Sequence, residues 1–132
     1  MVKSLWGELL TEDEVKPPIT ILKEQAAALA EVTKGVLTAE VSQSLFRGDF
    51  QLELRVIAPA LSGYEYSMLH AKHRIDMYPV KVRPGWTYTE GEIECEDAEQ
   101  LEAAIATILS SNHARRVVHS LLVQSKANSP AG

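Results

Sequence analysis

The stretch LTAEVSQSLFRGDFQLELRVIA, residues 37–58, decides the fold of this chain. Arg47 and Gly48 suit a two-residue hairpin turn, because glycine readily takes the positive φ that such turns need. This turn pairs Leu45 with Phe50 and fixes every other pair by the same count. Nine of the ten residues on one face are then apolar or small: Leu37, Ala39, Val41, Leu45, Phe50, Leu52, Leu54, Val56 and Ala58. We predict strands at about 37–46 and 49–58, with this face in the core.

The opposite face of the same hairpin is mostly polar, and Glu40 lies directly across from Arg55 as a predicted ion pair. A sheet with one apolar and one polar face is typical of antiparallel sheets that helices cover on one side. The sequence therefore predicts an α+β fold.

Three more strands are predicted downstream, at about 64–74, 78–83 and 91–95. Alternation along the first of them places Tyr64, Tyr66, Met68 and His70 on one side and Leu69, Ala71 and Ile75 on the other. Pro79 confines the strand 78–83 to an edge or to its own first residues, because proline cannot donate a ladder hydrogen bond. The predicted antiparallel sheet thus has four to five strands.

Helices are predicted before and after these strands. Residues 4–10 carry Leu5, Trp6, Leu9 and Leu10 along one side of a short helix. A second helix should begin near Thr20, which is placed to cap it, and end near Gly35.

Two helices are expected after the strands. Asp97 and Gln100 resemble a capping box, which predicts a helix start, and Asn112 should cap the last helix. The last helix has the strongest apolar pattern in the chain, formed by Ala114, Val117, Val118, Leu121 and Leu122. Residues 1–125 are expected to form a single domain with N-terminal and C-terminal helices packed on one face of the sheet, and residues 126–132 a flexible tail.

Composition limits the classes of function. Thirteen Lys and Arg stand against eighteen Asp and Glu, giving a formal net charge of −5, so a nucleic-acid partner is not expected. The single cysteine, Cys95, fits a reducing compartment, and we expect a cytoplasmic protein. No stretch approaches the roughly 20 apolar residues that span a bilayer, so no membrane partner is expected.

The sequence offers no catalytic set, metal site or cofactor motif. His70 and His73 are an odd number of residues apart on a strand, so they point to opposite faces. Three glutamates flank Cys95 closely, and their negative charge opposes a reactive thiolate. The tripeptide Arg47-Gly48-Asp49 is explained by turn chemistry rather than by adhesion.

Some residues are candidates for ligand binding. Aromatic groups with one polar handle suit a small-molecule pocket, which predicts a site near Tyr66, His70, Trp86 and Tyr88. Arg115 and Arg116, near the start of the last helix, could bind an anion with help from the helix dipole.

Four apolar residues are expected on the otherwise polar outer side of the domain: Phe46, Ile57, Leu69 and Ile75. Exposed apolar groups of this kind mark interaction surfaces. The leading hypothesis is therefore a non-enzymatic protein-interaction or assembly module that acts as a homodimer or binds another protein. The alternative is a small-molecule or anion-binding protein, possibly an enzyme.

Overall fold

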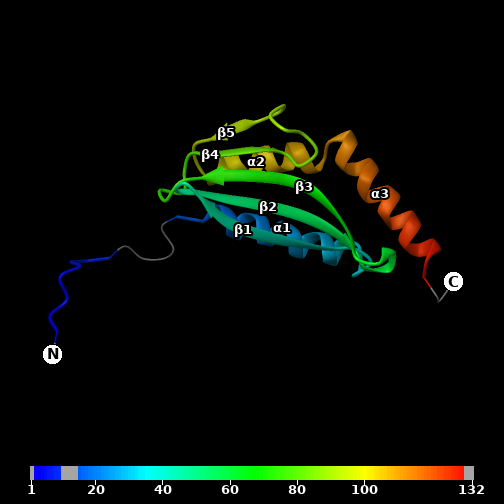
Figure 1. Ribbon diagram of the computed structural model, residues 1–132, viewed down its shortest axis with the longest axis horizontal. Helices are drawn as coiled ribbons and strands as arrows, with labels where there is room; N and C mark the ends of the chain where they lie inside the picture. Colours follow the sequence, from blue (N-terminus) through cyan, green and yellow to red (C-terminus); the bar gives the residue numbers. More distant parts are fainter. Residues whose placement is uncertain (1, 10–14, 130–132) are drawn as a thin grey trace.

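The structure is a computed structural model that describes residues 2–9 and 15–129 (Figure 1). In chain order its elements are α1 (Pro18–Val32), β1 (Thr38–Phe46), β2 (Asp49–Ala58), the 3-10 turn η1 (Pro59–Leu61), β3 (Tyr64–His73), β4 (Val80–Pro84), β5 (Ile93–Cys95), α2 (Ala98–Leu109) and α3 (Asn112–Ala127). The predicted α+β class is confirmed.

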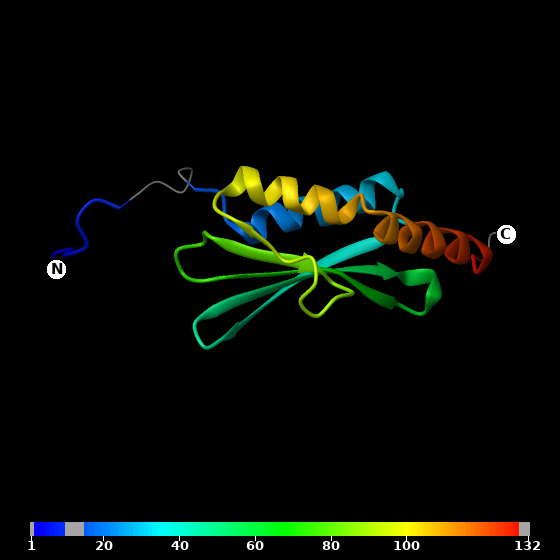
Figure 2. The same ribbon diagram turned by 90° about the horizontal axis from the view of Figure 1, so that it is seen from above.

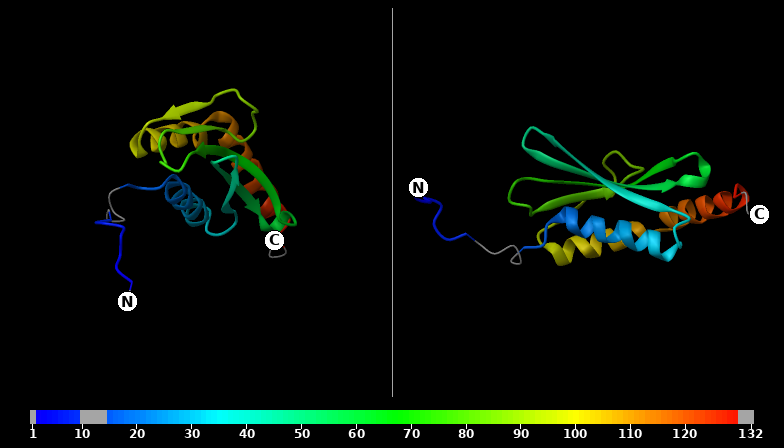
Figure 3. Two further views of the ribbon diagram at one scale, coloured as in Figure 1. Left: turned by 60° about the vertical axis from the view of Figure 1, so that its left-hand side comes forward. Right: turned by 90° about the horizontal axis from the view of Figure 1, so that it is seen from below.

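The five strands form one sheet in the order β1-β2-β3-β4-β5, and every neighbouring pair is antiparallel. Figure 2 shows all three helices on the same side of this sheet. The right-hand view of Figure 3 shows α1 beside α2, while α3 continues beyond them toward the other end of the sheet. The molecule is therefore a two-layer structure with one bare sheet face.

The β1–β2 hairpin has the predicted register. Leu45 pairs with Phe50 and Val41 pairs with Leu54. Arg47 and Gly48 have φ angles of 50° and 84°, which is the left-handed region that a two-residue turn of this kind requires. The alternation of side chains along residues 37–58 therefore fixes the two faces as predicted.

The helices cover only part of the apolar face. Leu52, Leu54 and Val56 are buried in the core, whereas Leu45 near the hairpin tip is 65% exposed. Figure 2 shows the β1–β2 hairpin diverging from the rest of the sheet at this end and bending away from the helix layer. The prediction that the whole face belongs to the core is wrong at the tip.

A β-bulge in β3 changes the predicted faces of this strand. Leu54 pairs with Leu69 while its neighbour Arg55 pairs with Ser67, so Met68 is an extra residue without a partner on β2. Met68 and Leu69 are both buried as a result. The expectation that Leu69 lies on the outer face is wrong, because the bulge inverts the alternation there.

The N-terminal part of the chain differs from prediction in two ways. Residues 2–9 contain no helix, so the helix expected over residues 4–10 is wrong for its described part; Leu10 lies outside the described residues. Helix α1 begins at Pro18, directly after Pro17, and Thr20 lies inside its first turn instead of capping it. Proline suits the first helical position because an N–H at that position would have no partner within the helix.

The C-terminal helices have well-defined caps. The Gln100 amide N–H donates to Asp97 Oδ1 at 2.8 Å, as the capping box predicts. Ser111, not Asn112, caps α3, because its hydroxyl accepts from the Ala114 N–H at 3.2 Å. Helix α3 continues to Ala127, so the tail predicted from residue 126 begins two residues later; residues 130–132 lie outside the described part.

The remaining boundaries are close to prediction. Strand β4 begins at Val80, just after Pro79, and the short β5 ends at the buried Cys95. Among the helices formed by residues 2–9 and 15–129, none combines the length and the apolar character needed to cross a bilayer.

Candidate functional site

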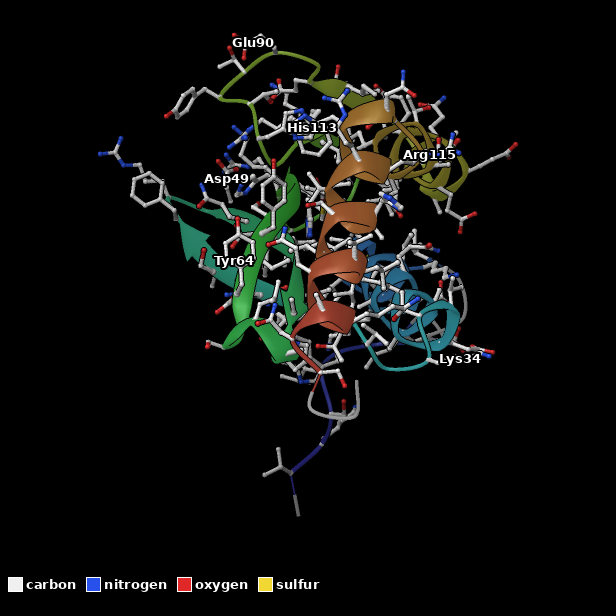
Figure 4. The ribbon with its side chains drawn as sticks, turned by 90° about the vertical axis from the view of Figure 1, so that its right-hand side faces the viewer. Lys34, Asp49, Tyr64, Glu90, His113 and Arg115 are labelled. Atoms are coloured by element: carbon white, nitrogen blue, oxygen red, sulfur yellow. The ribbon has the colours of Figure 1, made fainter. Side chains whose placement is uncertain are left out.

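A groove of about 610 Å³ lies between α3 and the first half of β3. Figure 4 looks onto it, with Tyr64 at the edge of β3 and His113 at the upper end of α3. Its lining residues are Leu61, Tyr64, Tyr66, His113, Arg116, Val117, Ser120, Leu121 and Gln124. This volume falls within the roughly 300–1,000 Å³ of typical ligand pockets.

The two walls of the groove follow from local geometry. Tyr64 and Tyr66 are two residues apart on β3, so both point to the helix side of the sheet. On α3, His113, Val117 and Ser120 recur at spacings of four and three, which places them along one side of the helix. An aromatic wall therefore faces a helix side that mixes apolar and polar groups.

The upper end of the groove is closed by an aromatic cluster. The Tyr66 hydroxyl lies 2.7 Å from His113 Nε2, within hydrogen-bond distance. The indole of Trp86 stacks on the same imidazole, with ring centroids 4.1 Å apart and planes 22° apart. Burial raises the pKa of Tyr66, with the nearby Tyr64 adding to the effect, so its hydroxyl stays protonated at neutral pH.

Gly85 holds Trp86 in this position. The Gly85 N–H donates to the Met68 carbonyl at 3.0 Å, which ties the turn after β4 to the bulged residue of β3. A Cβ at residue 85 would lie 2.3 Å from the Ser67 carbonyl oxygen, so no other residue fits without moving backbone. The indole reaches His113 because β3 and this turn approach so closely.

The structure brings together only part of the predicted aromatic pocket. Tyr66 and Trp86 both contact His113, but His70 pairs with Glu53 and lies on the opposite face of the sheet. Tyr88 is 92% exposed. The predicted grouping of these four residues around one pocket is therefore wrong, because the bulge turns His70 outward.

The two predicted anion-binding arginines lie on different sides of α3. Arg116 lines the groove, whereas Figure 4 shows Arg115 on the side of the helix away from Tyr64. Consecutive helical residues differ by about 100° around the axis, so the two cannot face one cavity. Of the six predicted ligand-binding residues, only Tyr66 and Arg116 line this groove.

The outer sheet face carries a charge cluster around Arg55. Its guanidinium contacts Glu65 at 2.5 Å, Glu40 at 3.4 Å and Glu53 at 3.7 Å. The predicted Glu40–Arg55 ion pair is thus confirmed, and two further carboxylates join it. One cation among three carboxylates leaves this cluster with net negative charge.

Beside this cluster, His70 does not have the geometry of a catalytic relay. Ser67 Oγ at 3.1 Å and Glu53 Oε2 at 3.7 Å both approach the same ring nitrogen, Nε2. In a serine hydrolase the base contacts serine through one nitrogen and the carboxylate through the other. Burial lowers the pKa of His70, and the positive charge of Arg83 lowers it further, against a smaller opposing effect of Glu53.

Cys95 is buried in the core at the end of β5. Burial raises the pKa of its thiol, and Asp97, Glu94 and Glu96 raise it further. The side chain therefore stays a neutral thiol and packs as a small apolar group. Within residues 2–9 and 15–129, no group of three or more potential metal ligands comes together.

The four predicted interface residues occupy different places. Phe46 is 56% exposed at the hairpin tip, where Arg47 lies over its ring, and Ile75 is 76% exposed after β3. Ile57 is half-buried on β2, and Leu69 is fully buried. They do not form one continuous patch on a single strand face.

The groove contains residues that the sequence did not single out for binding. Leu61, Tyr64 and Gln124 are examples, as is Val117, which was assigned only to the core stripe of α3. The i, i+3, i+4 and i+7 spacing of residues 113, 116, 117 and 120 is visible in the sequence and could have indicated a second helix side. Comparing the chain with protein-family models, curated proteins and solved structures gives no match.

Proposed function

We propose that this protein is a non-enzymatic interaction module that self-associates by accepting an apolar peptide segment in the groove between α3 and β3. The observation that carries this proposal is the groove itself, whose aromatic wall, Tyr64 and Tyr66, faces the apolar side chains of Val117 and Leu121. Grooves beside a helix with apolar anchoring positions are a recurring form of peptide recognition.

The exposure of the lining residues supports an open binding surface. Tyr64 is 49% exposed although it lies in a strand on the helix-covered face. Arg116, Ser120 and Gln124 are exposed along the helix wall. Aromatic rings and arginine are the groups most enriched at the energetic centres of protein interfaces.

The charge of the groove indicates which kind of segment fits. Arg116 supplies a cation and His113 a polar ring, and none of the lining residues carries a carboxylate. The chain as a whole has a net charge of −5. An apolar segment with acidic residues therefore complements the groove, and the acidic chain is itself a source of such segments.

The experiment is sedimentation equilibrium of the full chain and of Ser120→Arg. Ser120 is exposed, so a bulky cation there fills the groove without disturbing the core. We expect the native chain to dimerise at micromolar concentration and the variant to dissociate at least tenfold more readily. Thr107→Arg, the same type of change at an exposed position of α2, is the matched control and should leave dimerisation unchanged. A native chain that stays monomeric at hundreds of micromolar contradicts the proposal.

A second candidate function is the binding of a small amphipathic anion in the same groove. The presence of Arg116 and Tyr66 in one groove favours it, since such a ligand would place an apolar body on the aromatic wall and a carboxylate near the guanidinium. Titration with decanoate, followed through the fluorescence of Trp86 in a Trp6→Phe chain, tests this candidate. Arg116→Gln should weaken decanoate binding about tenfold but leave decanol binding unchanged.

We also place this activity in the cytoplasm. The single cysteine is buried and kept protonated, which suits a reducing compartment in which no disulfide is needed. Fractionation of cells that produce the full chain tests this assignment, because a cytoplasmic chain should be recovered in the cytosolic fraction and not with exported proteins.

A further inference from the structure

The N-terminal segment Val2–Leu9 holds four of the twelve exposed large apolar side chains of the described chain. Its apolar residues Val2, Leu5, Trp6 and Leu9 are 94%, 88%, 81% and 75% exposed. Large apolar groups that are clustered and exposed in this way mark interaction sites, and here a tryptophan lies among leucines. We call this segment the N-terminal arm.

The sequence of the arm has the apolar spacing of an amphipathic helix. At 100° per residue, Leu5, Trp6 and Leu9 fall on one side of a helix, and Gly7 falls on the opposite side. In the structure residues 2–9 form no helix. This agrees with physical expectation, because helices shorter than about 12 residues are marginal without a surface to pack on.

The groove between α3 and β3 is the complementary surface. It offers aromatic and aliphatic walls for Trp6 and the leucines, and Arg116 for a carboxylate such as Glu8. Within the arm the charges of Lys3 and Glu8 balance, and the described lining of the groove includes no acidic side chain that would repel Glu8. The apolar character of the arm therefore matches that of the groove, and Arg116 can pair with the one carboxylate of the arm.

The place of attachment makes the groove of the same copy a poor partner. Figure 1 shows the arm leaving the domain at the end opposite to the C-terminal end of α3. The fifteen residues of α1 alone span about 22 Å. The eight residues between Leu9 and Pro18 reach at most about 30 Å when fully extended. Because α3 continues beyond α1 and α2 (Figure 3), docking within one copy would use most of this reach.

From these observations we infer that the N-terminal arm of one copy docks as a short helix in the α3–β3 groove of a second copy, and that the exchange is reciprocal. Two equivalent arms in two equivalent grooves give a closed, two-fold symmetric dimer. This inference rests on the proposed function of the groove and names the segment that fills it.

Sedimentation equilibrium of Trp6→Ala tests the role of the arm. We expect the dimer to dissociate at least tenfold more readily than that of the native chain, with the urea midpoint of the domain unchanged. Tyr88→Ala is the matched control, because Tyr88 is a similarly exposed aromatic residue outside both arm and groove, and this variant should dimerise like the native chain.

Mixed disulfide trapping shows which copy the arm enters. One chain carries Leu5→Cys and the other Ser120→Cys, while the native Cys95 is buried and does not compete. Mild oxidation of the mixture should give a disulfide-linked heterodimer, and replacing Ser120→Cys by Thr107→Cys should abolish it. A disulfide-linked heterodimer no more abundant than the one formed with Thr107→Cys overturns the inference. A Leu5→Cys, Ser120→Cys double variant whose disulfide forms only within one chain overturns it as well.

The outcomes separate this inference from the proposed function. If Ser120→Arg weakens the dimer and Trp6→Ala does not, the groove is an interaction site but the arm does not fill it. If the native chain does not associate at all, both proposals fail.

Discussion

The outer sheet face around Arg55 and the groove between α3 and β3 both gather polar side chains, but they differ in how these groups are partnered. On the outer face one guanidinium contacts three carboxylates within 4 Å. In the groove, Arg116 and Ser120 are exposed beside half-buried apolar residues. The first surface has already used its charged groups within the fold. In the second, the Ser120 hydroxyl accepts from the Gln124 amide at 2.9 Å, but the Arg116 guanidinium has no ion-pair partner among the described residues.

This contrast distinguishes polar residues that stabilise a sheet from polar residues that can bind. A carboxylate held by an internal arginine gains little from a new partner, because the new contact must replace an existing one. An apolar groove with a polar rim gains both burial and new hydrogen bonds when it is filled. The three predictions below test the two surfaces and the bulge that separates them, from the largest effect to the smallest.

The largest effect is expected for Leu69→Ala. Leu69 has no exposed surface, so its truncation should lower the free energy of unfolding by about 2–5 kcal/mol. Ile75→Ala, at a position 76% exposed, should change it by less than about 0.5 kcal/mol. Urea denaturation measures both. A loss of unfolding free energy for Leu69→Ala as small as that for Ile75→Ala would show that the bulge does not turn Leu69 into the core.

An intermediate effect is expected for Arg55→Ala. Each partly exposed ion pair contributes up to about 1 kcal/mol, so losing three contacts should cost about 1–2 kcal/mol of unfolding free energy. Dimerisation should not change, whereas Ser120→Arg should affect dimerisation and not stability. Glu40→Gln, which removes only one contact, is the control for stability. An Arg55→Ala variant that fails to dimerise but unfolds normally would reverse the roles of the two surfaces.

The smallest effect is expected for His70→Gln and depends on pH. Because the pKa of His70 is lowered in the folded state, the unfolded chain binds more protons as pH falls below the ordinary value of 6.5. The native chain should therefore lose stability from this residue as the pH falls through 6.5, and the glutamine variant should lose less. Unfolding free energies measured at several pH values give the difference. A native chain that gains stability relative to the variant on acidification would contradict the lowered pKa.

The hairpin could be predicted from sequence because all its information is local. Gly48 permits the turn, and the strict alternation on both sides fixes the register down to the Val41–Leu54 pair. The capping box at Asp97 was predictable for the same reason. In each case a few neighbouring residues contain the whole physical cause.

The site could be predicted only in fragments because it depends on contacts between distant segments. Tyr66 and Arg116 were candidates, but the Tyr66–His113 contact joins residues 47 positions apart. The bulge at Met68 has no signature in the alternation, so His70 was assigned to the wrong face. The turn after β4 packs against β3 and so brings Trp86 to His113. No local sequence pattern indicates this packing either.

The consecutive order of the strands has a consequence for synthesis of the chain. Every strand pairs with its neighbours in sequence, so the sheet can assemble progressively as it leaves the ribosome. Helices α2 and α3, however, are translated after all five strands. Until they arrive, the nascent sheet presents buried residues such as Leu69 and Val82 to water. Chains interrupted before residue 98 would therefore be the form most in need of chaperones.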